Sequence, residues 1–274
     1  MKKLSKKDRI LLVVCGLIIV VITSYYGWFF WPWFGGKVVR FNPSLNTILS
    51  FETTPLDYPY EALLIENTTE LNRHQICRYF RDITLKSEFG ARTPVISKWE
   101  TPILLYVGGN PSKEDLTIIN EICNALNSLP GFPGIRQVDD EASANMIYSF
   151  LDDTAYDKWE RPRGIQGSLG LAILSYDEPN TKIIHAECGI RNTDPRYAEG
   201  VFSRTTTIYE EFLQAMGPIN DTLLYSETLF YNGDYDVPGP TAFDWIILRL
   251  LYLPQIQNGM TYMNCLPYIF QYLR

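Results

Sequence analysis

The stretch "TTTIYEEFLQAMGPIND" (residues 205–221) decides how the rest of this chain is interpreted. A helix turns about 100° per residue, and on that wheel an apolar stripe is formed by Ile208, Phe212, Ala215 and Met216. We therefore predict a helix over residues 203–217. Glu211 falls on the edge of the stripe, where a carboxylate is either half-buried in a cleft or hydrogen-bonded in place. Burial would raise the pKa of this carboxylate and suit it to the role of a general base.

The same stretch keeps the spacing of a zinc-protease helix but lacks its histidines. That pattern is H-E-x-x-H, and its extended form adds x-x-G-x-x-H. Glu211 and Gly217 take the glutamate and glycine positions. The three histidine positions are taken, in order, by Glu210, Gln214 and Asn220, and Asp221 follows. Because zinc prefers imidazole or thiolate ligands, we predict no metal and no cofactor. The oxygen atoms of these residues would suit calcium or magnesium better, which stays open.

The N-terminal region carries the signature of a membrane anchor. No charged residue lies between Arg9 and Lys37, and this run exceeds the about 20 residues that cross a bilayer. An aromatic belt ends it, formed by Tyr25, Tyr26, Trp28, Trp31 and Trp33. We predict a cytoplasmic basic tail over residues 1–9, an uncleaved anchor over residues 10–33 that contacts the lipid bilayer, and a periplasmic or extracellular remainder. A cleaved signal peptide would leave the outward placement unchanged.

Charge and cysteine content limit the partners and the chemistry. The net charge is −7 and the first nine residues carry +4, which leaves −11 for the rest of the chain. Phosphate contacts need positive charge, so we predict no nucleic-acid partner. Four outward cysteines lie where disulfides persist, and the sequence leaves their pairing open. They are Cys77, Cys123, Cys188 and Cys265.

Beyond the anchor we predict a stalk and N-terminal extension over residues 34–97 and one domain over residues 98–274. Expected strands span residues 101–109, 144–152, 171–176 and 181–190, and "DTAYDKWERPRGIQGSLG" (153–170) is interpreted as a loop. Expected helices span residues 69–83, 110–131, 203–217 and 241–252, with a last helix broken near Pro267. This order predicts an α+β domain with a small mixed sheet and packed helices.

The chain resembles a family of bacterial envelope domains of unknown function that is distantly similar to metzincin peptidases. The resemblance is carried by E-E-x-x-Q-A-[LM]-G-x-x-N-D (210–221), "SETLF" (226–230), D-W-x-x-L-R-x-L-Y (244–252) and "PQIQNGMT" (254–261). It covers roughly residues 98–262 and implies a metzincin-like fold. The expected strand–helix–strand–strand–strand–helix order also matches a metzincin-like half-domain. "SETLFYN" stands where such peptidases have a methionine turn, but it contains no methionine.

The resemblance implies a place for a substrate as well. His185 lies on a predicted strand next to the position where a peptidase substrate would pair, but an ordinary surface or hydrogen-bonded strand histidine is the favoured interpretation. The binding candidates are therefore Glu210, Gln214, Asn220, Asp221 and His185, and Glu211 is the one catalytic candidate.

Three functions are compatible with these residues. The missing imidazoles favour a non-catalytic protein that binds a peptide or an envelope protein, or serves as a scaffold in a membrane complex. The retained Glu211 favours an unusual hydrolase in which this carboxylate activates water. In the third possibility, the 203–217 helix serves only the hydrophobic core, and the function lies on the aromatic-rich surface or the stalk. A hydrogen-bonded Glu211, with Asp221 capping a helix over 222–230, would fit the first function.

Overall fold

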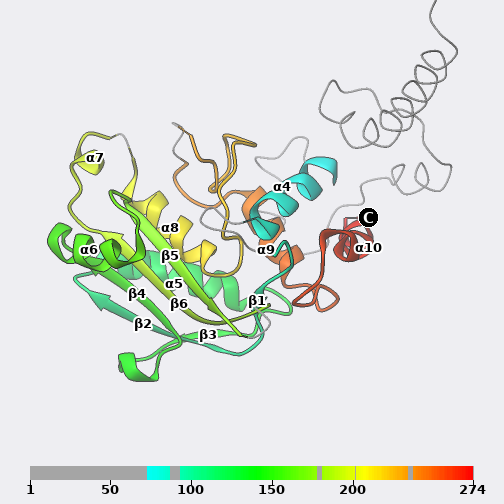
Figure 1. The fold of residues 1–274 in the computed structure, drawn as a ribbon, viewed down its shortest axis with the longest axis horizontal. Coiled ribbons are helices and arrows are strands. Elements are labelled where there is room, and N and C mark those ends of the chain that lie inside the picture. The colour runs from blue at the N-terminus through cyan, green and yellow to red at the C-terminus, as the bar shows by residue number, and fades with distance from the viewer. Residues whose placement is uncertain (1–72, 87–92, 178–180, 201, 234–236, 274) are drawn as a thin grey trace, which may run out of the picture. The chain divides into compact units, whose positions relative to one another are not determined.

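The structure, a computed structural model, describes residues 73–86, 93–177, 181–200, 202–233 and 237–273 (Figure 1). The predicted anchor and most of the predicted stalk lie outside these residues. Within them, no helix is both long and apolar enough to span a bilayer. The helices are α4 (Arg73–Leu85), α5 (Lys113–Asn127), η2 (Glu141–Ser143), α6 (Asp153–Glu160), η3 (Arg161–Arg163), α7 (Pro195–Ala198), α8 (Arg204–Gln214), α9 (Ala242–Leu251) and α10 (Tyr262–Tyr272).

A six-stranded mixed sheet forms the centre of the fold. Its strands are β1 (Lys98–Trp99), β2 (Ile103–Gly109), β3 (Ile135–Gln137), β4 (Met146–Leu151), β5 (Gly170–Tyr176) and β6 (Lys182–Arg191). The order is β1-β6-β4-β2-β3 with every neighbouring pair parallel, and β5 pairs antiparallel with β6. The domain is thus a mixed α/β fold with a largely parallel sheet.

One face of the sheet carries α5 and α8. Alternate residues of β4 point to this face, and Met146, Tyr148 and Phe150 are fully buried there. Tyr148 donates a hydrogen bond of 2.8 Å to the carbonyl of Ile208 in α8. The opposite face is covered near its end by α6, whose Trp159 ring lies where a side chain at Gly189 of β6 would be. The absence of a side chain at Gly189 therefore allows α6 to pack closely against the sheet.

A second group of helices, α4, α9 and α10, packs together beside the sheet. Asp244 of α9 is fully buried and accepts hydrogen bonds from the Tyr79 hydroxyl (2.6 Å) and the Thr241 amide (2.7 Å). Lys98 of β1 is buried too, and its ammonium donates to the carbonyl of Leu251 at the end of α9 (2.9 Å). Burial lowers the pKa of Lys98 to about 8. Asp244 thus joins α9 to α4, and Lys98 joins the sheet to the end of α9.

Most elements agree with the sequence predictions, but the short strands β1 and β3 and the short helix α7 were not predicted, and three further segments differ. Residues 153–160 form helix α6 rather than loop, because Asp152 caps its first turn. Helix α10 continues through Pro267. Residues 222–230 form a turn rather than a helix, closed by a hydrogen bond of 2.8 Å from the Thr222 amide to the Phe230 carbonyl. The cysteines whose pairing the sequence left open, Cys77, Cys123, Cys188 and Cys265, are free and buried.

Asp115 connects the N-termini of the two helices on the sheet. It completes the Ser112 capping box of α5 and accepts two hydrogen bonds from the Arg204 guanidinium at the start of α8. Burial alone would raise the pKa of Asp115, but the hydrogen bonds from Arg204 and Ser112 hold it below its usual value.

Asp115→Ala should lower the free energy of unfolding by about 2–3 kcal/mol at neutral pH, because the cap and the partner of Arg204 are both lost. Since the folded-state pKa of Asp115 is depressed, its contribution is present above the unfolded-state pKa and disappears as the pH falls through the folded-state value. Denaturant titrations at several pH values measure this. Glu114→Ala, an exposed neighbour in the same helical turn, is the control. Equal losses in the two variants would contradict the assignment.

Candidate functional site

Helix α8 is buried on nearly every side, and other elements supply the partners for the carbonyls at its C-terminus. Residues of the predicted stripe are fully buried, and so is Leu213 on another side. At the C-terminus, the Trp99 indole donates to the Ala215 carbonyl and the Tyr252 hydroxyl to the Met216 carbonyl, both at 2.8 Å. Gly217 then turns the chain with a φ of +126°, and a side chain there would meet the Ser97 carbonyl. The position of α8 is therefore fixed from the sheet and from α9 together.

Glu211 lies under the first residue of β5. Its side chain is only 7% exposed. A β-carbon built on Gly170 would lie 2.5 Å from Glu211 Cγ, 2.6 Å from Glu211 Oε1 and 2.6 Å from Thr207 Cγ2. Real β-carbon contacts are not that short, so only glycine lets β5 approach the helix this closely. The structure thus places the predicted catalytic candidate against β5, an edge strand of the sheet.

Tyrosines and a thiol surround the Glu211 carboxylate. Burial, and after it the nearby charge of Glu211, raises the pKa of Cys188 well above its usual value. Burial raises the pKa of Tyr197 to about 12, with Glu211 adding to the effect. Tyr148 is affected in the same direction, again chiefly through burial. Near neutral pH these groups are uncharged, so the site is a weakly polar one in which a carboxylate interacts strongly with charge.

The other predicted residues separate into two places. Gln214 donates a hydrogen bond of 2.8 Å to Asp221 Oδ1, so these two lie together past the end of α8. Asn220 is directed to α4 instead, where its amide nitrogen Nδ2 donates to the Asp82 carbonyl at 3.1 Å. Glu210 is partly buried on α8. Spacing alone had suggested that all of these residues converge.

His185 is on the other face of the sheet from Glu211. It pairs with Ser175 of β5, and its Nε2 lies 3.7 Å from Glu187. Its neighbour Ala186 and the next alternate residue, Cys188, point toward α8 instead. Among the residues that the structure describes, no group of three or more histidine, cysteine, aspartate or glutamate side chains is arranged to hold a metal ion.

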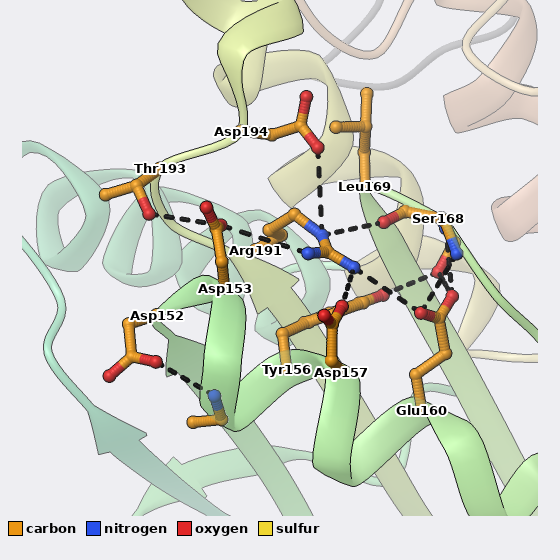
Figure 2. A network of polar contacts seen from close by, with 12 residues as sticks. Asp152, Asp153, Tyr156, Asp157, Glu160, Ser168, Leu169, Arg191, Thr193 and Asp194 are labelled. Atoms are coloured by element: carbon orange, nitrogen blue, oxygen red, sulfur yellow. Dashed lines mark hydrogen bonds and ion pairs between the residues drawn. The ribbon is translucent and has the colours of Figure 1, made fainter.

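A buried arginine that no sequence pattern had indicated, Arg191, ends β6 (Figure 2). Arg191 is 6% exposed, and its Nη2 lies 2.7 Å from Asp157 and 3.4 Å from Glu160. Asp153 and Asp194 lie farther out, at 3.9 and 3.8 Å from the guanidinium. The carboxylates of Asp153 and Asp157 are about half exposed, so their ion pairs add little to stability. The network mainly fixes the geometry of the segments that it joins.

The same network fixes the segment that enters β5. Glu160 accepts hydrogen bonds from the Gly167 amide (3.1 Å), the Ser168 amide (2.9 Å) and the Ser168 hydroxyl (2.6 Å). Arg191 Nε donates to the Ser168 carbonyl at 3.2 Å. The signal for this in the sequence was the spacing of Asp153, Asp157 and Glu160, which places three acids on one side of a helix.

Strand β5 presents one edge that no described strand pairs with. The Arg191 amide donates to the Leu169 carbonyl at 2.9 Å, so the backbone of Leu169 faces β6. Backbone groups alternate along an antiparallel pair. The N–H and C=O groups of Gly170, Ala172 and Leu174 therefore point away from β6, toward the free edge.

A family model described as "protein of unknown function (DUF2927)" matches residues 73–271. No curated protein matches the chain.

Asp221→Asn should stabilise the protein at pH 7 by about 1–2 kcal/mol, or roughly 3–6 °C in Tm. Burial raises the pKa of Asp221 to about 6, although the hydrogen bond from Gln214 opposes this. The folded state therefore disfavours ionisation, and stability falls as the pH rises from about 4 to about 6. Asparagine keeps an acceptor for Gln214 without the charge. Thermal melts at pH 4 and pH 7 measure this, with exposed Asp139→Asn as the control. A loss of stability at pH 7 would contradict the prediction.

Proposed function

The chain belongs to this family of unknown function (DUF2927), and we propose that it is a non-catalytic protein that binds an extended polypeptide along the free edge of β5. The observation that carries the proposal is the row of outward N–H and C=O groups at Gly170, Ala172 and Leu174. An unpaired edge of this kind is a template for strand addition, in which main-chain hydrogen bonds supply affinity. The network at Arg191 and Glu160 holds the start of this strand in place.

A degenerate metzincin-like origin fits this function. The elements β2, α5, β4, β5, β6 and α8 follow one another in the order expected of a metzincin-like half-domain, but β3, α6 and α7 are inserted among them. At the histidine positions, Gln214 is bonded to Asp221 and Asn220 is directed to α4. These residues have structural partners, and their amides are poor zinc ligands. Retention of the scaffold without the ligands supports binding rather than cleavage.

The predicted anchor completes the proposal. With residues 10–33 in the bilayer and the basic tail inside, the domain would face the periplasm or the exterior and bind an envelope protein or peptide there. Resistance of the full-length protein to alkaline extraction from membranes, together with cleavage of the domain by protease added from outside, is the expected result. Release by alkali would contradict the anchor.

Leu174→Pro should weaken peptide binding at least tenfold, because proline removes an outward N–H while leaving the bonds of β5 to β6 intact. Leu174→Ala is the matched control, since it also loses the side chain but keeps the N–H. The probe is a displayed library of random 12-residue peptides selected on the full-length protein in detergent. Selected peptides should also slow hydrogen exchange at Gly170, Ala172 and Leu174. Equal binding to the two variants, or no selection above background, would contradict strand addition.

A second candidate function is hydrolysis with Glu211 as general base, favoured by the burial of this carboxylate against the edge strand β5. The same selected peptides distinguish it. Their cleavage by the wild-type protein, abolished in a folded Glu211→Gln variant, would support the hydrolase over the binding protein.

A further inference from the structure

The contact between Gly170 and Glu211 adds chemistry to the β5 edge. Because Gly170 has no side chain, the Glu211 carboxylate occupies the space beside the strand where that side chain would be, 2.6 Å from the β-carbon position. The carboxylate therefore lies at the level of the strand. We propose that Glu211 selects a peptide with a lysine or arginine at the residue that pairs with Gly170; this inference rests on the proposed strand addition at β5.

Strand geometry brings the ligand side chain to the carboxylate. Residues directly opposite each other on neighbouring strands point to the same face of a sheet, with β-carbons about 4.5–5.5 Å apart. The ligand residue opposite Gly170 would therefore direct its side chain to the face that carries α8. With no side chain at Gly170 in between, a long side chain reaches Glu211 across the strand.

The surroundings of the carboxylate favour a cation over a neutral donor. Glu211 is 7% exposed and lies near Tyr148 and Tyr197, which are uncharged at neutral pH. A charge-assisted hydrogen bond in such a place is roughly twice as strong as a neutral one. Only one ligand position benefits, because the next two positions on this face would lie opposite Ala172 and Leu174, which pack on the apolar core.

The test uses peptides selected by strand addition, identified by their loss of binding to Leu174→Pro. Each basic residue of such a peptide is replaced singly, lysine by norleucine and arginine by citrulline. At one position the replacement should weaken binding to the wild-type protein at least tenfold. On Glu211→Gln the same replacement should change binding less than twofold, since the coupling is lost. Glu211→Asp keeps the charge and should retain part of the preference.

Two further measurements keep the outcomes separate. Glu114→Gln makes the same change in net charge at an exposed site on α5 and should leave the preference intact. Thermal melts show whether Glu211→Gln is folded. Strand-adding peptides with no basic position coupled to Glu211 would overturn this inference and leave the proposed function standing. Peptides that bind Leu174→Pro and Leu174→Ala equally would overturn both.

Discussion

The burial of α8 on nearly every side is the constraint on which the domain depends. A buried helix needs partners for its terminal carbonyls, because an unpaired polar group away from water is unfavourable. Trp99 of β1 and Tyr252 at the end of α9 supply these partners. The cap therefore connects the sheet with the second helix group. The same burial brings Glu211 against β5, where only glycine at position 170 leaves room for it.

Arg191, the buried arginine at the end of β6, fixes the segment that enters β5. Arg191 ends β6 and reaches carboxylates of α6 and of the chain after β6, and it donates a hydrogen bond to the Ser168 carbonyl in the segment before β5. Its charge is matched where water is scarce, because Glu160 is only 2% exposed. An edge strand anchored in this way keeps its outward backbone groups in a fixed line. The charge network around Arg191 thus fixes the position of the β5 edge. The proposed selection of a basic residue at this edge comes from a separate group, the Glu211 carboxylate.

Local sequence patterns predicted the main helices and strands because apolar spacing and helix capping act between residues that are close in the sequence. The apolar spacing of Ile208, Phe212 and Met216 placed α8, and Ser112 placed the start of α5. The contact of Glu211 with Gly170 could not be predicted, because it depends on how β5 and α8 align across a long stretch of chain. Helix α6 was missed because its apolar residues are few, and its cap at Asp152 carried the only strong signal.

The spacing of the zinc-protease helix predicted only in part where the candidate residues lie. Spacing copied from a zinc helix suggested that Glu210, Gln214, Asn220 and Asp221 share one site. In the structure Gln214 bonds to Asp221, but Asn220 bonds to the carbonyl of Asp82 in α4. Spacing along one helix constrains only the residues within that helix. After Gln214 the chain leaves α8, and tertiary contacts decide where the later residues lie.

The order of the strands has a consequence for how the protein is made. Strands β2, β3 and β4 pair among themselves. Among the described strands, β1 and β5 pair only with β6, which comes last of these strands in the chain. A growing chain would therefore hold two strands without partners until Arg191 has left the ribosome. Unpaired strand edges are prone to associate with other chains. During synthesis the chain is thus prone to associate with other chains, and this period ends when β6 pairs with β1 and β5.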